Sequence, residues 1–334
     1  MYGIVSVEIE GSVRNMQGFP VKSDYDAEIH DGLAKLFEVS AYLGFPFTLE
    51  EAANYFLPKS NITGMQLSSL LSSETFSDLK FVVKDGYLFA TEGQSVASRR
   101  EREKMSAAKL ESAASFAKLL SRLVPFVRTI AVTGSVAYGS ADKWDDIDLF
   151  VLTERKRLWM STLLMLIQIR LHKLLRIRPA HLLQFCMSYV HDEEGFSNES
   201  RRSRTNALFA RELLKAKPVA GMEKYRRILE ENQWVSEFYS ISYRQKLRLL
   251  AGGLNGAAVQ KDGTRGVQSL FSDWGEGIAY MFLSRYLRLR AYLANLKLKA
   301  EGKNLRSFEP VISSESCVYT SNFYRWLTTL WGDS

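Results

Sequence analysis

Two aspartates are the residues of this chain whose type and spacing best suit chemistry. Asp146 and Asp148 stand one residue apart at the beginning of an apolar, strand-like run that extends to Leu152. Because successive side chains of a strand alternate between its two faces, these two point the same way, about 7 Å apart at the backbone. Two converging carboxylates suit Mg²⁺, which keeps water and substrate phosphates as its other ligands. The spacing therefore predicts a divalent-cation site.

A glycine–serine pair precedes the two aspartates. Gly134 and Ser135 directly follow a β-branched run at residues 127–133. Glycine lets the backbone approach a phosphate closely, and Ser135 adds a hydroxyl and an N–H at the start of a helical turn, where an anion is favoured. Together with the cation site, this turn would hold a metal-bound triphosphate for attack at one phosphorus, with the metal neutralising the developing charge.

The order strand, Gly134-Ser135, short turn and Asp146-Ile147-Asp148 strand resembles the polymerase-β-like nucleotidyltransferase superfamily. The resemblance implies that Ser135 contacts the triphosphate of an NTP. It also implies that Asp146 and Asp148 are catalytic and bind Mg²⁺ or Mn²⁺. Asp145 alternates away from this pair and stays outside the metal-binding set. The implied reaction is metal-dependent transfer of a nucleotidyl group from an NTP to a hydroxyl-bearing acceptor, with release of pyrophosphate.

A third carboxylate is harder to place. Members of the superfamily that catalyse transfer usually supply one from a later strand, but no Asp or Glu lies between Arg155 and His191. The nearest acids, Asp192 and Glu193, follow the strand predicted at residues 182–190. Either one of them curls back into the site or the position is vacant, and vacancy is favoured because an acid past the strand end lies in the wrong layer. A vacant position favours the alternative function, a catalytically weak or inactive nucleotide-binding or protein-interaction module, since two-metal displacement needs both ions clamped.

Weaker motifs extend the resemblance over most of the chain, from about residue 30 onward. They lie at residues 185–190, 207–214, 218–221 and 232–235 and are similar to a group of uncharacterised microbial nucleotidyltransferase-domain proteins. Those proteins also begin with a winged-helix-like module. The resemblance names no acceptor, so a small molecule, an RNA and a protein all stay open as partners beside the NTP.

Residues 1–95 are accordingly predicted to form a winged-helix-like N-terminal domain. Helical spacing of apolar residues is followed by a Thr48–Glu51 capping box and two shorter helices. An Asp85-Gly86 pair then divides two β-rich runs, which is typical of a hairpin. The third helix, at residues 63–73, contains no Arg or Lys. Because phosphate contacts require basic side chains, sequence-specific DNA binding is not expected.

The remaining chain is predicted to form two further parts, which gives an α/β (α+β) fold class. Residues 96–215 would be the nucleotidyltransferase core with a short mixed β-sheet, and residues 216–334 a helical C-terminal domain. Near the middle of the latter, an apolar stripe at helical spacing is expected to pack into the core: Met281, Phe282, Leu289, Tyr292, Leu293 and Leu296. The basic cluster at residues 201–204 favours a solvated loop over a grip on triphosphate or nucleic acid.

Composition narrows the class of protein. Apolar residues make up 46% and charged residues 24% of 334 residues, the balance of an ordinary globular protein with two or three modules. The net charge of +7 is modest for this length. Cys186 and Cys317 stand far apart, so neither a disulfide framework nor a zinc site is implied and a reducing compartment fits. The longest apolar stretch, residues 158–169, is too short for the roughly 20 residues that cross a bilayer. We therefore expect a cytoplasmic protein with no membrane partner.

Overall fold

The computed structural model describes residues 24–73, 76, 79, 81–175, 179–254 and 273–331. The first 23 residues of the predicted N-terminal domain, and Lys80 before its hairpin, lie outside these ranges. The helices are α1 (Asp24–Leu43), α2 (Leu49–Tyr55), α3 (Gly64–Leu71), α4 (Val96–Leu123), α5 (Gly134–Tyr138), α6 (Leu158–Leu174), α7 (Glu193–Arg202), α8 (Ala207–Lys215), α9 (Met222–Glu231), α10 (Val235–Phe238), α11 (Ser240–Leu254), α12 (Asp273–Ala300) and α13 (Asn322–Trp331). The strands are β1 (Phe47–Thr48), β2 (Val82–Lys84), β3 (Tyr87–Phe89), β4 (Val127–Thr133), β5 (Ile147–Thr153), β6 (Phe185–Asp192), β7 (Lys217–Ala220), β8 (Phe308–Ile312) and β9 (Ser316–Ser321).

The N-terminal part follows the order α1-β1-α2-α3-β2-β3, and its three strands form an antiparallel sheet in the order β1-β3-β2. The predicted capping box is confirmed: the Glu51 N–H donates to Thr48 Oγ1 (3.0 Å), and the Thr48 N–H donates to Glu51 Oε2 (2.9 Å). The predicted hairpin is confirmed as well. Asp85 and Gly86 both take positive φ angles, 52° and 78°, as a tight turn between paired strands requires.

The central sheet has six strands in the order β7-β4-β5-β6-β9-β8. β5 and β6 are parallel, and all other neighbours in this sheet are antiparallel. The parallel pair is joined by the crossover helix α6, because parallel neighbours cannot be joined by a tight turn. The predicted mixed sheet with helices, an α+β arrangement, is confirmed.

The prediction that residues 216–334 are helical is wrong in three places. β7 pairs with β4 at one end of the central sheet, and the β8–β9 hairpin continues the sheet beyond β6. The physical reason lies in the edges, since β4 and β6 would otherwise each leave a row of backbone groups without partners. The hairpin segments are also rich in β-branched and aromatic residues such as Val311, Val318 and Tyr319.

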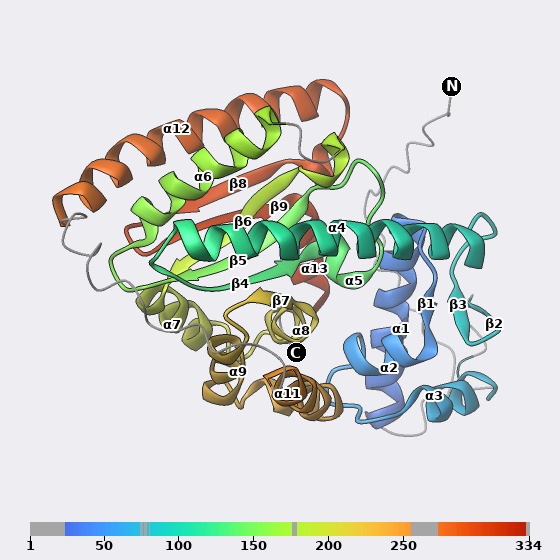
Figure 1. Cartoon of the computed structure of the whole chain (residues 1–334). Coiled ribbons are helices and arrows are strands. Elements are labelled where there is room, and N and C mark those ends of the chain that lie inside the picture. Colours follow the sequence, from blue (N-terminus) through green and yellow to red (C-terminus); the bar gives the residue numbers. More distant parts are fainter. Residues whose placement is uncertain are drawn as a thin grey trace.

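Helices cover both faces of the sheet (Figure 1). One face carries α4, α6 and α12, whose buried side chains pack with Ile147, Leu149 and Val151 of β5. The opposite face of the same strand, with Phe150 and Leu152, packs against α7 to α11. This alternation follows from the two-residue period of a strand, and it directs Asp148, two residues before Phe150, toward the α8 side.

The N-terminal part is tied to the core by the 28-residue helix α4. At its start, Arg99 is 4% exposed and forms a bidentate ion pair with Glu51 at 2.9 and 3.1 Å. At its other end Phe116 and Leu120 lie in the sheet core. A second tie is hydrophobic, because Leu327 and Trp331 of α13 complete the core of the N-terminal part.

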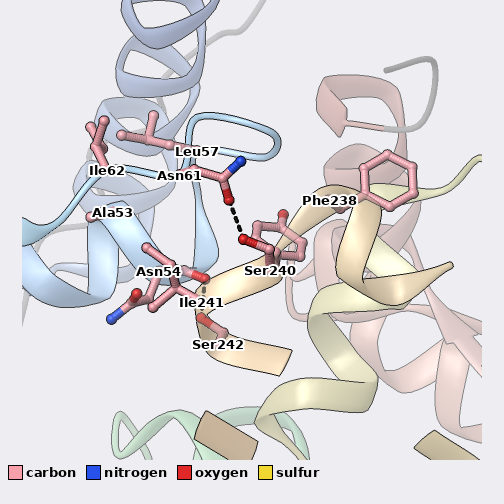
Figure 2. A pocket seen from close by; sticks show the side chains of 10 residues that line it. Ala53, Asn54, Leu57, Asn61, Ile62, Phe238, Ser240, Ile241 and Ser242 are labelled. Atoms are coloured by element: carbon pink, nitrogen blue, oxygen red, sulfur yellow. Dashed lines mark hydrogen bonds between the residues drawn. The ribbon is translucent and has the colours of Figure 1, made fainter. Parts of the chain in front are cut away.

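A seam also joins α2 to the α10–α11 corner (Figure 2). The Ser240 hydroxyl donates to Asn61 Oδ1, and the Ser242 hydroxyl donates to the Asn54 carbonyl oxygen at 2.8 Å. The hollow between them measures only about 10 Å³, room for about one water molecule. It is therefore a packed contact between parts and no ligand site. Among the described residues, no helix combines the length and the apolar character needed to traverse a membrane.

Candidate active site

The glycine–serine turn and the aspartate-bearing strand meet at one corner of the central sheet. β4 and β5 are antiparallel, and Thr133, the last residue of β4, pairs with Asp148. Gly134 follows with φ of 62°, and a Cβ atom built there would lie 2.4 Å from Asp148 Oδ2. Any larger residue would therefore displace the carboxylate or the turn. The structure brings Gly134 and Asp148 into direct contact.

Asp146 and Asp148 flank Ile147 on an extended segment. Asp146 immediately precedes β5 and is exposed, whereas Asp148 lies within β5 and is half-buried. Ile147 and Leu149 are buried in the core on the opposite face, so they fix the orientation of the strand. The anchoring of the apolar positions holds the two carboxylates on the side that carries the Gly134 turn.

The pKa values of this pair are raised by partial burial and, at Asp148, by neighbouring negative charges. Burial is the largest cause that raises the pKa of Asp148, to about 7; the charges of Asp146, Asp145 and Glu212 raise it further, while a hydrogen bond from Ser188 opposes them. Burial also raises the pKa of Asp146. A cation between these oxygens would relieve both effects.

Three basic residues partly offset the charge of Asp146. Lys173 of α6, Lys109 of α4 and Arg290 of α12 each lower its pKa, against the larger effect of burial. Lys109 has no exposed surface, and its ammonium donates to the carbonyl oxygens of Lys143 (3.4 Å) and Asp145. This lysine therefore fixes the loop that leads into the aspartates. Nothing in the local sequence marks it, because only the fold brings α4 to this loop.

Asp145 belongs to the loop and not to the carboxylate pair. Its Oδ2 accepts a hydrogen bond from the Asp142 N–H at 3.0 Å, and its own N–H donates to Asp142 Oδ1 at 2.9 Å. This reciprocal pair closes the turn before β5. The geometry agrees with keeping Asp145 outside the metal-binding set.

The strand β6, from which a third carboxylate would come, presents neutral side chains to Asp148. β6 runs beside β5 with Cys186 opposite Asp148, and the Ser188 hydroxyl donates to Asp148 Oδ1. Burial raises the pKa of the Cys186 thiol to about 12, so it stays protonated. Asp192 lies at the other end of β6, opposite Thr153. Of the two alternatives for the third carboxylate, the return of Asp192 is therefore wrong.

Glu193 is likewise held away from the site. It begins α7, beyond the far end of β6, and forms an ion pair with Lys224 at 2.7 Å. Within the described residues, no group of three or more His, Cys, Asp or Glu side chains could hold a metal ion. Two carboxylates with their remaining coordination left to water and phosphate still fit Mg²⁺. The donor set thus suits one well-held divalent cation better than two.

Ser135 lies where the sequence predicted, one residue past the contact between Gly134 and Asp148. Its carbonyl oxygen accepts a hydrogen bond from the Ser140 N–H at 2.9 Å, which closes the short α5 turn. Its half-buried hydroxyl makes no hydrogen bond to the described part of the chain, so it is available to a ligand. Behind this turn, the Tyr138 hydroxyl donates to Glu212 of α8 at 2.7 Å and fixes α5 against the core.

The basic cluster at residues 201–204 lies far from this corner. Arg201 and Arg204 line a hollow of about 390 Å³ beside Leu152, four residues beyond Asp148 along β5. Four residues of strand correspond to about 13 Å. The cluster therefore does not reach the aspartate pair, and the hypothesis that it grips the same triphosphate is not supported.

Comparison with known families now adds an independent finding. Residues 114–214 match the family model of the nucleotidyltransferase domain. This range contains Gly134, Ser135, Asp146 and Asp148 together with β4, β5 and β6. Residues 114–214 therefore form a nucleotidyltransferase domain of the polymerase-β-like family, and this domain supports a general function in nucleotidyl transfer. No curated protein and no solved structure matches the chain.

Proposed function

We propose that this protein transfers a nucleotidyl group from an NTP to a hydroxyl-bearing acceptor, with Mg²⁺ or Mn²⁺ held by Asp146 and Asp148. The observation that carries the proposal is the contact of Gly134 with the carboxylate of Asp148, where an added Cβ would lie 2.4 Å from Oδ2. This contact places the Gly134 backbone, the Ser135 hydroxyl and the carboxylates of Asp146 and Asp148 at one corner of the nucleotidyltransferase domain.

Each residue has a task that follows from its surroundings. Gly134 leaves room for the Asp148 carboxylate beside the turn, and Ser135 offers its hydroxyl to a phosphate oxygen. Asp146 and Asp148 hold the cation, and Ser188 orients Asp148 through its hydrogen bond. When bound, the metal supplies charge stabilisation at the transferring phosphorus. Lys173 and Arg290, close enough to act on Asp146, add positive charge at the mouth of the site.

We interpret the N-terminal part as a winged helix. The element order, the β1-β3-β2 sheet and the hairpin support this interpretation. The buried Arg99–Glu51 pair and the Leu327–Trp331 contact suggest that it serves as a structural part of the enzyme. A cytoplasmic location is part of the proposal, because Cys186 and Cys317 are both free thiols.

A second candidate function is a nucleotide-binding module with weak or no turnover. Ser188 and Cys186 favour it, because they stand on β6 where a third carboxylate would be needed to clamp a second ion. Under this alternative the same two aspartates would bind a metal–nucleotide complex, and the protein would act through what it contacts.

The decisive experiment measures pyrophosphate release and thermal stabilisation with each of the four NTPs, in Mg²⁺ and in Mn²⁺. We expect Asp146→Asn with Asp148→Asn to abolish metal-dependent nucleotide binding and to lower any turnover by more than about a thousandfold. The matched control is Glu28→Gln with Asp31→Asn on the exposed side of α1, which changes the charge equally. Metal-dependent stabilisation without pyrophosphate would select the binding module. Nucleotide affinity that is equal in the two double variants would refute the site.

A further inference from the structure

The outer surface of α6 and α12 is apolar and exposed. We name it the α6–α12 face and define it by Leu171, Leu174, Trp274, Phe282, Leu289 and Leu293, which are between 43% and 82% exposed. Three of these residues belong to the stripe that was predicted to pack into the core, so that prediction is wrong. Monomeric soluble proteins rarely expose contiguous apolar patches beyond a few hundred Å². A set of exposed apolar side chains of this kind indicates a binding surface.

The two helices form one continuous platform. They run side by side in the same direction over the sheet (Figure 1). Near their starts, the Glu276 carboxylate accepts hydrogen bonds from the Trp159 and Met160 N–H groups at 2.6 and 3.0 Å. Further along, Arg170 donates to the Tyr286 hydroxyl at 2.6 Å. The two exposed apolar surfaces are therefore held in a fixed relation to each other.

The inner side of α12 already has its own packing partners. Ala279, Leu283 and Leu287 belong to the sheet core, and Ala291 is buried as well. The exposed side chains lie on the opposite side of the helix, and the fold does not need them for its interior. Their apolar character therefore requires a cause outside the core.

The charges along the α6–α12 face are predominantly positive, although Lys297 forms an ion pair with Glu301 directly after α12. From Trp274 to Ala300, every exposed charged residue is basic, and the one acid in this stretch, Glu276, is turned toward α6. The exposed basic residues of α12 are Arg285, Arg288, Arg290, Lys297 and Lys299. On α6, Arg170 and Lys173 continue this positive rim.

In contrast to the expectation from the sequence that there is no membrane partner, we propose that the α6–α12 face binds the surface of a membrane that contains anionic lipids. Aromatic and aliphatic side chains on one side of a helix, flanked by Lys and Arg, suit a helix lying in the plane of the headgroups. The basic rim is complementary to the negative surface potential of such a bilayer. The 28 residues of α12 extend over about 42 Å, a long and shallow contact that fits a flat surface.

A second copy of this chain is a poorer occupant. A two-fold pairing along the whole of α12 would place the middle of the helix against the middle of its copy. Arg285 and Arg288 lie there, so arginines would face arginines without an acid between them. An anionic surface would instead attract these arginines.

The location gives the contact a consequence for the candidate active site. Lys173 and Arg290 belong to the positive rim, and both also act electrostatically on Asp146. Asp146 therefore lies within electrostatic range of the positive rim.

The test is cosedimentation with two kinds of vesicle, phosphatidylcholine alone and phosphatidylcholine with about a quarter phosphatidylglycerol. We expect the full chain to pellet with the anionic vesicles only, and less so when salt rises from about 0.1 M to about 0.5 M. Phe282→Glu with Leu289→Glu should lower partitioning by about tenfold or more. Arg285→Gln with Arg288→Gln, which leaves the apolar side chains intact, should lower binding to anionic vesicles by a smaller factor.

The matched control is Leu249→Glu on α11, a leucine that is 73% exposed outside the α6–α12 face. It should pellet like the unmodified chain, and all variants should keep its melting temperature because the replaced side chains are exposed. Equal retention in the supernatant with both vesicle types would overturn the proposal, as would an equal loss in Leu249→Glu. Light scattering without lipid that shows a dimer split by Leu289→Glu would assign the face to a second copy instead. None of these outcomes depends on nucleotide turnover.

Discussion

The pair of strands formed by β5 and β6 has one aspartate at each of its two ends, Asp148 and Asp192. The surroundings of these two residues differ. Asp192 is 1% exposed at the far end of β6, where it accepts hydrogen bonds from the N–H groups of Gly195 (2.8 Å) and Lys156 (2.9 Å). Asp148 stands near the start of β5 and receives one hydroxyl, from Ser188. Among the described residues, no backbone N–H donates to it.

This difference separates a structural carboxylate from one that is available for ligands. Asp192 is the N-cap of α7, so its oxygens satisfy the first backbone donors of that helix and a loop donor. Asp148 lies beside Asp146 and Gly134, and burial is the largest cause that raises its pKa to about 7. The same residue type therefore serves the fold at one end and is proposed to hold a cation at the other.

The largest effect is expected at the turn that contacts Asp148. Gly134→Ala should lower turnover or metal–nucleotide affinity by about a hundredfold or more, because an intrusion on this scale misplaces the carboxylate. The control is Gly44→Ala, a glycine with a similar φ of 58° but nothing within 4 Å of the added Cβ. Both variants carry the backbone strain, roughly 1–2 kcal/mol, so chemical denaturation measures that part. Equal activity of Gly134→Ala and Gly44→Ala would contradict the functional difference proposed between Asp148 and Asp192.

The next effect concerns His191, the neighbour of Asp192 at the closed end. It is 2% exposed, and burial lowers its pKa to about 4. Between pH 6.5 and 4, His191 binds a proton in the unfolded chain but not in the folded chain. His191 alone should therefore lower the free energy of unfolding by up to about 3 kcal/mol as the pH drops from 6.5 to 4, whereas Asp148, with its raised pKa, acts in the opposite direction over the same range.

Urea unfolding across this pH range measures the effect. Relative to the unmodified chain, His191→Leu should gain stability as the pH drops from 6.5 to 4, because the group that binds a proton only in the unfolded chain is gone. His30→Gln, which replaces a half-buried histidine of α1, serves as the control and should follow the pH dependence of the unmodified chain. A constant difference between His191→Leu and the unmodified chain across this range would contradict the prediction.

The smallest effect is expected from Asp192→Asn. Asparagine keeps one acceptor oxygen but loses the charge at the start of α7, which should lower the free energy of unfolding by about 1 kcal/mol. Activity per folded molecule should stay unchanged, since Asp192 lies at the opposite end of β6 from the candidate site. A loss of turnover comparable with that of the Asp146 and Asp148 variants would make the two ends functionally alike.

The grouping of the candidate site residues was predictable from the sequence because its determinants are local. Gly134, Ser135, Asp146 and Asp148 lie within one strand–turn–strand unit, so alternation along the strand places them without knowledge of the rest of the fold. The Thr48–Glu51 capping box and the Asp85–Gly86 hairpin were predictable for the same reason.

Contacts between distant segments were not predictable in this way. Lys109 meets the Asp145 loop only because α4 crosses the sheet, and Ser188 meets Asp148 only through the register of β5 and β6. The apolar stripe on α12 shows a related limit. Helical spacing indicates that Leu289 and Leu293 share a side, but not whether the protein or something outside it covers that side. The strands after residue 216 were missed because their pairing partners, β4 and β6, lie far away in sequence.

The contact of α13 with the N-terminal part has a consequence for how the chain is made. Leu327 and Trp331 belong to the same cluster as Leu33, Leu36 and Phe56. A ribosome delivers the early residues long before the late ones, and domains generally fold in that order. Here the interior of the N-terminal part stays incomplete until α13 emerges. Folding of this part thus depends on a helix that is made after α1 to α12.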